Sequence, residues 1–161
     1  MHRARMSTLK KTPDTVSVTA DCSDLEGLVG YNLKRAYVIV QSDFRHALGK
    51  DGLSARSFSA LSLVVQNPEI TQSELSRLLK IERSGLVAIV DELETHEYIS
   101  RTTVPGDRRV QALVPLNAGM AAYSQALSQV QTHEKKLLAN LNDSELKTLL
   151  QLLKKVRQCE G

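Results

Sequence analysis

Apolar side chains recur every three or four positions along most of the chain, which is the spacing of amphipathic helices. One such segment spans residues 24 to about 48 and is followed by the sequence Gly-Lys-Asp-Gly, which is typical of a helix end. Ser54 then has the position of an N-cap for a second helix, whose apolar stripe ends before Pro68. The pattern therefore predicts two helices in the first part of the chain.

Residues 71–95 are predicted to form two short helices joined by a tight turn. Thr71 and Glu74 have the spacing of a capping box, in which each side chain accepts the other residue's backbone amide. Thr71 and Gln72 are also candidates for phosphate contacts from the start of this helix. About four residues separate the two helices, as a helix-turn-helix requires. The apolar stripes are Leu75, Leu78 and Leu79 in the first helix and Leu86, Ile89, Val90 and Leu93 in the second.

The spacing changes to a β-type pattern after the second of these helices. Two β-branched runs, residues 99–103 and 110–114, flank a Pro-Gly-Asp turn and predict a hairpin. Pro115 fits at the end of the second strand, where it interrupts no ladder. A helix-turn-helix followed by such a hairpin is the pattern of a winged helix.

Two further helices are predicted at the C-terminal end. Asn117 is a plausible N-cap for a long helix that extends to about Leu141. Asn142 and Glu145 again have capping-box spacing, and a regular leucine stripe follows them.

The expected domain organisation is one mainly α-helical domain over residues 24–161, preceded by a flexible, basic N-terminal arm over residues 1–23. Within it, the winged helix covers about 54–116, and apolar helices at about 24–48 and 117–158 flank it. These flanking helices are too apolar to stand alone. We therefore expect a homodimer that presents two winged helices to a pseudo-palindromic site on double-stranded DNA.

Composition changes this picture little. The chain has 161 residues, with 21 Lys plus Arg and 18 Asp plus Glu, so its net charge of +3 does not by itself indicate nucleic acid. It contains no apolar run long enough for a membrane span and no visible signal peptide, so no membrane partner is expected. The two cysteines, Cys22 and Cys159, form no disulfide framework, which favours a cytoplasmic location.

The start of the second helix in the helix-turn-helix carries the residues expected to face base edges in the major groove. Arg83 can contact a phosphate or a guanine edge, and Ser84 can cap the helix or bond a phosphate. Gly85 allows the backbone to approach DNA closely, and Val87 can contact a thymine methyl group. The alternative for Arg83 is an ordinary solvated surface arginine.

The predicted hairpin has a basic tip. Arg108 and Arg109 lie at the tip and Arg101 lies on the first strand. Arginine suits the negative potential of a narrow minor groove. Asp107 is a poor neighbour for phosphate, and we expect it to hold an adjacent arginine through a charge-assisted bond. An ordinary charged hairpin tip is the alternative.

These features together resemble the MarR-type (multiple-antibiotic-resistance regulator) winged-helix family, over roughly residue 25 to the C-terminus. The resemblance implies a homodimeric repressor that loses DNA affinity when a small aromatic or anionic effector binds between its dimerisation and DNA-binding regions. It also implies that Asp107 supports the wing and that Arg109 enters the minor groove. The residues that carry the resemblance are Gln72, Leu75, Leu93, Glu94, Arg101, Asp107, Arg108 and Arg109.

The chain departs from the family pattern in the recognition helix. Gly85, Val87 and Ala88 stand where relatives commonly carry small hydroxyl residues and a basic residue. This departure predicts sparse hydrogen-bonded base recognition, with more weight on the wing, on DNA shape and on phosphates.

The first predicted helix carries candidates for effector binding. Its sequence Gly-Tyr-Asn-Leu-Lys-Arg-Ala, residues 30–36, is similar to members that regulate aromatic-acid catabolism, some of which respond to aromatic acyl-CoA thioesters. Cations in this region can bind a carboxylate or a CoA phosphate, and aromatic side chains can flank a ring. The alternative assigns the aromatic residues to the core and the cations to the surface. The candidates are Tyr31, Arg35, Tyr37, Arg45, His46 and Phe58.

Other functions remain open at this point. A cysteine-based redox sensor would use Cys22 or Cys159, although neither has an evident thiolate-stabilising setting. A metal sensor would need His46, His96, His133 and Cys159 to be brought together by folding, because their spacing is not that of metal ligands. A winged helix that serves only protein contacts is a further alternative.

Catalysis has no support in the sequence. The chain contains none of the motifs Gly-rich phosphate loop, HExxH, GxSxG or CxxC, and its acidic residues have the positions of caps and solvated faces. We expect neither an enzyme nor a bound cofactor.

Overall fold

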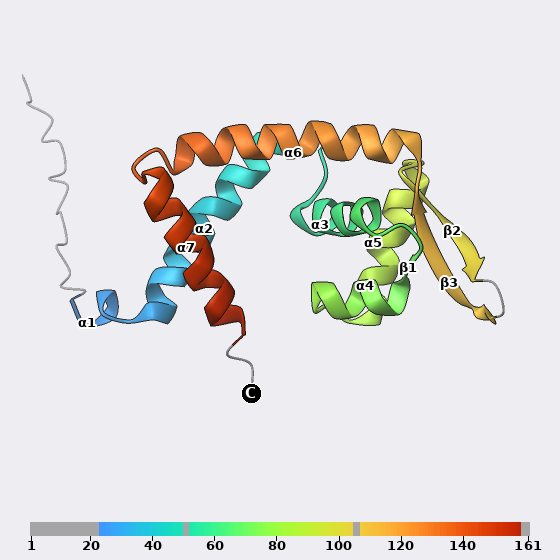
Figure 1. Cartoon of the computed structure of the whole chain (residues 1–161), viewed down its shortest axis with the longest axis horizontal. Helices are drawn as coiled ribbons and strands as arrows, with labels where there is room; N and C mark the ends of the chain where they lie inside the picture. Colours follow the sequence, from blue (N-terminus) through green and yellow to red (C-terminus); the bar gives the residue numbers. More distant parts are fainter. Residues whose placement is uncertain (1–22, 50–51, 105–106, 159–161) are drawn as a thin grey trace, which may run out of the picture.

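A long helix, α6 (Asn117–Leu137), joins the two parts of the molecule (Figure 1). At one end it packs against α2 (Val29–Leu48), and α7 (Asp143–Arg157) follows α6 at that same end. At the other end it leads into a compact winged helix. The computed structural model describes residues 23–49, 52–104 and 107–158. No helix within these ranges combines the length and apolarity that a membrane crossing requires.

The winged helix consists of three helices and a small sheet. The helices are α3 (Ala55–Gln66), α4 (Gln72–Leu79) and α5 (Arg83–Thr95). The strands β1 (Ile70–Thr71), β2 (Ile99–Val104) and β3 (Asp107–Pro115) form an antiparallel sheet in the order β1-β3-β2. The buried core lies between the helices and the sheet. It contains Ala60, Leu61, Val64, Ile70, Leu75, Leu86, Ile89, Val90, Leu93, Ile99 and Leu113.

The caps predicted at Ser54, Thr71 and Asn142 are confirmed. The Ser54 hydroxyl accepts the amide of Ser57 at 3.0 Å and starts α3. Thr71 and Glu74 form the reciprocal capping box of α4, and the box predicted at Asn142 starts α7. The mainly α-helical winged-helix architecture, with helices on both sides of it in the sequence, is thus the one that the periodicity predicts.

The single helix predicted from residue 24 is wrong, because the chain breaks between α1 (Ser23–Glu26) and α2. Leu28 is extended, with φ −92° and ψ 123°. The Asn32 side-chain amide donates to the carbonyl oxygens of Glu26 at 2.7 Å and Leu28 at 2.9 Å and so bridges the break. Leu28 and Gly27 therefore form a corner that the apolar spacing alone does not reveal.

Two further expectations need correction. Asn117 is the first residue of α6 and not its N-cap; Leu116 has the N-cap position and makes no side-chain capping bond. The helix also ends at Leu137, short of the expected Leu141. Strand β1, only two residues long, was not predicted, since so short a run has no detectable period and depends on pairing with Leu113 and Ala112.

The direction of α6 relative to the wing is fixed by a close backbone approach. The carbonyl oxygen of Tyr98 accepts the N–H of Leu116 at 2.9 Å. A methyl group added to Gly119 would lie 2.0 Å from the same oxygen, so only glycine permits this contact. The start of α6 is therefore held against the residue that precedes β2.

Helices α2 and α7 contain no buried residue within the single chain. Because large apolar side chains on both helices face solvent, these helices need a further protein surface to cover them. The exposed large hydrophobic residues of α2 and α7 are Val29, Leu33, Tyr37, Val38, Ile39, Val40, Leu149, Leu150, Leu152 and Val156.

We expect Gly119→Ala to lower the free energy of unfolding by about 1–3 kcal/mol or more, because its methyl group must displace backbone at Tyr98. The matched control is Gly85→Ala, another glycine in a helix, whose added Cβ has nothing within 4 Å. That control should raise stability by about 0.5–1 kcal/mol through helix propensity. Thermal unfolding of both variants tests the contact, and equal midpoints would contradict it.

Candidate functional site

The turn between α4 and α5 sets the orientation of α5. Lys80 has φ 52° and ψ 43°, the left-handed conformation that ends α4. The Ile81 amide donates to the Ser76 carbonyl oxygen at 3.2 Å, and the Ser76 hydroxyl donates to the Ile81 carbonyl oxygen at 2.7 Å. These reciprocal bonds close the turn from both directions, so α5 starts at a defined angle to α4.

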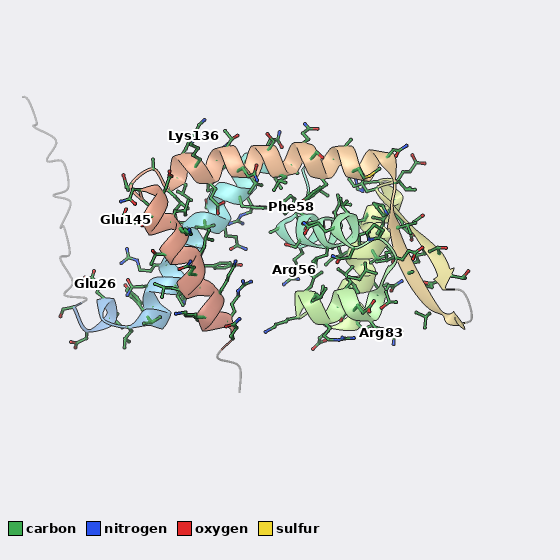
Figure 2. All side chains as sticks on the ribbon, in the orientation of Figure 1. Glu26, Arg56, Phe58, Arg83, Lys136 and Glu145 are labelled. Carbon is green, nitrogen blue, oxygen red and sulfur yellow. The ribbon has the colours of Figure 1, made fainter. Side chains whose placement is uncertain are left out.

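Helix α5 has one buried and one exposed face. Its buried face consists of Leu86, Ile89, Val90 and Leu93, which pack in the core as their periodicity predicts. The exposed face includes Arg83 and Ser84 in the first turn, and Figure 2 shows Arg83 at the end of the winged helix farthest from α6. Val87, in the next turn, is a large apolar residue that is exposed to solvent. The exposed face lies on the second helix of the helix-turn-helix, the position of a recognition helix.

The N-terminus of α5 is open, unlike that of α4. Glu82 has the N-cap position but makes no side-chain capping bond, so Ser84 is the second residue of the helix and not its cap. Amides in an uncapped first turn are suited to a phosphate oxygen, and the helix dipole adds a partial positive charge there. Arg83 adds a full positive charge at the same end.

The first turn of α4 is, by contrast, occupied by its own cap. The Thr71 hydroxyl accepts the Glu74 amide at 3.2 Å and donates to Oε2 of Glu74 at 2.7 Å. Backbone and side-chain hydrogen bonds from Thr71 hold the pKa of Glu74 below its ordinary value. Capping is therefore the evident role of Thr71, and its predicted phosphate contact stays a prediction.

Gln72 is tied to the sheet. Its side-chain amide donates to Oε1 of Gln111 on β3 at 3.3 Å. This bond links the start of α4 to the wing strand. A phosphate contact by Gln72 stays a prediction as well.

Arg101 is held by the recognition helix. Its guanidinium forms ion pairs with Asp91 and Glu94, and its backbone N–H donates to Oε1 of Glu94 at 3.0 Å. The arginine, on β2, therefore joins the wing to α5 and neutralises carboxylates next to the exposed face of the helix. Direct DNA contact by Arg101, which the sequence suggests, stays a prediction.

The tip of the wing carries the other predicted DNA contacts. Asp107, Arg108 and Arg109 open β3, and Asp107 pairs with Val104 across the hairpin. The side chains of these three residues lie outside the described part of the structure. The wing contacts implied by the family resemblance therefore stay predictions.

A second site lies between the winged helix and α2. An open cavity of about 620 Å³ is lined by Arg45 and His46 from α2 and by Arg56 from the start of α3. Two of these, Arg45 and His46, are among the predicted effector contacts. Arg56 was missed, because only folding brings the first turn of α3 next to the end of α2; Figure 2 shows it at the end of α3 nearest α2 and α7.

Glu92 connects this cavity to the recognition helix. It lines the cavity from α5 and also lines a neighbouring cavity of about 350 Å³ that reaches α6. The fully buried hydroxyl of Ser57 donates to its carboxylate at 3.0 and 3.1 Å, and Ser57 also bonds the Ser54 hydroxyl at 2.8 Å. A polar chain thus links the start of α3 to α5 beside the cavity cations.

The aromatic candidates do not line these cavities. Phe58 packs edge-on against Phe44 at 5.5 Å between ring centroids and lies 6.0 Å from Tyr123, so it joins α3 to α2 and α6. On α2, the Arg35 guanidinium lies 5.7 Å from the ring centroid of Tyr31. Tyr37, a third α2 candidate, is 60% exposed. For these residues the structure indicates packing or surface roles within one chain.

The histidines considered as metal ligands each contact a different group. His46 bonds the Ser42 carbonyl oxygen at 2.7 Å, and His96 bonds that of Glu92 at 2.8 Å. His133 lies 3.3 Å from Asp43. Among the residues that the structure describes, no group of three or more potential ligands is brought together. Cys22 and Cys159 lie outside the described residues.

A winged helix with an open recognition-helix N-terminus defines the class of protein, a DNA-binding regulator. The model of the MarR family matches residues 51–110. A putative transcriptional regulatory protein for the hcr operon of Thauera aromatica is 29% identical over 133 residues, which cover 82% of this chain and 80% of that protein. The multiple antibiotic resistance protein MarR of Escherichia coli K12 is 32% identical over 106 residues, covering 65% and 73%.

Solved structures agree with these relatives. The transcriptional repressor CouR bound to a 23-mer DNA duplex superposes with a TM-score of 0.82 at 34% identity, covering 86% of this chain and 98% of that one. CouR bound to p-coumaroyl-CoA gives a TM-score of 0.77 at 32% identity, covering 87% and 99%. The chain belongs to the MarR family. It is a dimeric, DNA-binding transcriptional regulator, as the sequence predicts.

If Arg83 contacts a phosphate, as its position at the start of α5 predicts, Arg83→Gln should weaken binding to any DNA duplex by removing one such contact from each protomer. The slope of log affinity against log salt concentration should become shallower by about 2 for the dimer, near one per lost contact. Arg157→Gln, at the end of α7, removes the same charge far from α5 and serves as the control. An unchanged salt slope for the Arg83 variant would show that Arg83 makes no phosphate contact.

Arg101→Gln should weaken DNA binding by about 1 kcal/mol or more, because Asp91 and Glu94 lose their counter-charge. If neutralisation is the cause, adding Asp91→Asn should recover much of the lost affinity. The measurement is a double-mutant cycle on DNA affinity, with thermal unfolding as the folding check. Absence of any recovery would instead favour direct contact between Arg101 and DNA.

Proposed function

We propose that the protein is a cytoplasmic, non-enzymatic repressor that an anionic aromatic effector releases from its operator. The effector class is an aromatic carboxylate or its CoA thioester. It binds in the cavity between α2 and the winged helix. This cavity lies between the proposed dimerisation helices, about 24–48 and 117–158, and the DNA-binding unit at about 54–116. The single observation that carries the proposal is the gathering of Arg45, His46 and Arg56 around that cavity.

Charge and shape support an anionic ligand. Two guanidinium groups provide planar, permanently charged donors, which suit carboxylate and phosphate oxygens. Leu53 and Ala55 add apolar surface between these donors. A volume of about 620 Å³ is within the range of small-molecule sites. Because the cavity is open, a bulky group attached to the acid has room to extend into solvent.

The position of the cavity supports a regulatory role. Glu92 projects into it from α5, and Arg56 precedes the buried Ser57 that holds Glu92. An anion bound by Arg56 therefore acts next to the link between α3 and α5. A ligand shifts the equilibrium between a DNA-binding and a released state only by its difference in affinity for the two. The proposal requires that the bond between Ser57 and Glu92 differ between these states.

The relatives add chemical detail. CouR has been solved both on DNA and with p-coumaroyl-CoA, an aromatic acyl-CoA. A further structural relative, PcaV of Streptomyces coelicolor, shares the fold at a TM-score of 0.77. The identity of 32% to the p-coumaroyl-CoA complex makes aromatic acyl-CoA thioesters the first class to test.

The test uses p-coumaroyl-CoA, p-coumarate and free CoA as separate probes. Thermal unfolding reports binding to the full chain, and release of a DNA duplex selected from random sequence reports regulation. We expect the double variant Arg45→Gln with Arg56→Gln to weaken binding of the active probe by about 1.5–3 kcal/mol for each of the two charged bonds lost, roughly a hundredfold or more in total.

Arg35→Gln is the matched control, since Arg35 lies on the same helix but outside the cavity and contacts Tyr31. It should leave ligand affinity unchanged. DNA affinity without ligand should be the same in all these proteins. Equal ligand binding by the double variant and the wild-type protein would rule out the cavity as the effector site.

A further inference from the structure

The exposed face of the recognition helix lacks hydrogen-bonding side chains in its centre. Ser84, Val87, Ala88 and Asp91 follow one another at helical spacing on this face, and all are exposed. Asp91, at the far end, is paired with Arg101. Between Ser84 and Asp91 the helix therefore presents only the side chains of Val87 and Ala88.

Packing within the chain does not explain the valine. Val87 is 40% exposed, whereas Leu86 beside it is 1% exposed and Val90, one turn later, is fully buried. Among the exposed large hydrophobic residues of the described chain, Val87 is the one on α5. Valine also forms helices less readily than alanine, so an exposed helical position gains nothing from it in stability.

The location of Val87 points to DNA. Arg83 and the uncapped amides of the first turn favour a phosphate at the start of α5. Val87 lies one turn further along the same face, where a recognition helix contacts base edges in the major groove. Gly85, also exposed, has open space around its Cα, so no side chain holds this part of the helix away from the bases.

Only one of the four bases offers an apolar group in the major groove. Thymine carries a C5 methyl group, whereas adenine, guanine and cytosine present donors and acceptors at their edges. Purine recognition commonly uses the forked ends of Arg, Asn or Gln, and the centre of this helix face has none of them. A methyl group is therefore the partner that Val87 and Ala88 can recognise.

We propose that Val87 is a specificity-determining residue that recognises the C5 methyl group of a pyrimidine, thymine in the natural operator, at one symmetry-related position in each half-site. The inference rests on the DNA-binding function. It predicts that the methyl group matters more than the hydrogen-bonding pattern of that base pair. A 5-methylcytosine–guanine pair should therefore substitute better than an unmethylated cytosine–guanine pair.

The experiment starts by selecting duplexes from a random-sequence library with the full-length wild-type protein. Each thymine of the selected duplex is then replaced, together with its symmetry mate, by deoxyuridine, which lacks only the methyl group. Loss of the methyl contact should lower wild-type affinity about fourfold at each half-site, and therefore roughly fifteenfold when both methyl groups are removed. Other thymines in the duplex serve as internal controls and should tolerate the replacement.

The matched protein variant is Val87→Ala, which keeps the helix and removes the two methyl groups of valine. Its thermal unfolding should match or slightly exceed that of the wild-type protein, because the position is exposed. The variant should bind the thymine and deoxyuridine duplexes nearly equally. It should also fail to distinguish 5-methylcytosine from cytosine at the sensitive position.

Two results would overturn the inference. One is that no thymine in the selected duplex is sensitive to deoxyuridine, and the other is that the sensitivity persists unchanged in Val87→Ala. Failure of DNA binding itself is a separate outcome, because it would appear as absence of salt-dependent affinity for any duplex. The inference and the function on which it rests are thereby tested independently.

Discussion

The backbone carbonyl of Tyr98 holds α6 against the wing, since its oxygen accepts the Leu116 amide and lies against the Cα of Gly119. Helix α6 also packs on α2 and α3, so its direction determines where α2 lies relative to the winged helix and α5. A dimer can place two recognition helices in successive major grooves only when this geometry is defined, because half-sites lie about one helical turn, or a multiple of it, apart.

Helix α5 has contacts of three kinds along its length. Its start carries the exposed Arg83, its middle presents Val87, and its end contacts the wing through Arg101 and lines the cavity beside α2 through Glu92. A rigid helix transmits a shift at one end to the other, so under the proposed function a ligand that displaced Glu92 would also displace Arg83 and Val87. The buried Ser57 hydroxyl is the contact that opposes such a shift in the structure described here.

Features that depend on neighbours in sequence were predictable, and features that depend on folding were not. The Thr71–Glu74 box and the apolar stripe of α5 involve residues three or four apart, so spacing alone reveals them. Arg56 lines the same cavity as Arg45 only because folding brings the start of α3 to the end of α2. The ion pairs of Arg101 with Asp91 and Glu94 likewise require β2 to lie against α5. The sequence therefore predicted the class of the DNA-binding surface better than the lining of the cavity.

The apolar faces of α2 and α7 make repression depend on the concentration of the protein. Since neither helix buries a residue within one chain, their stability depends on association, and the folded population rises with protomer concentration. A lone protomer also lacks the second recognition helix that an operator with two half-sites requires. While dimers are scarce, operator occupancy then grows with the square of the number of chains, so a small change in expression near that threshold alters repression more than proportionally.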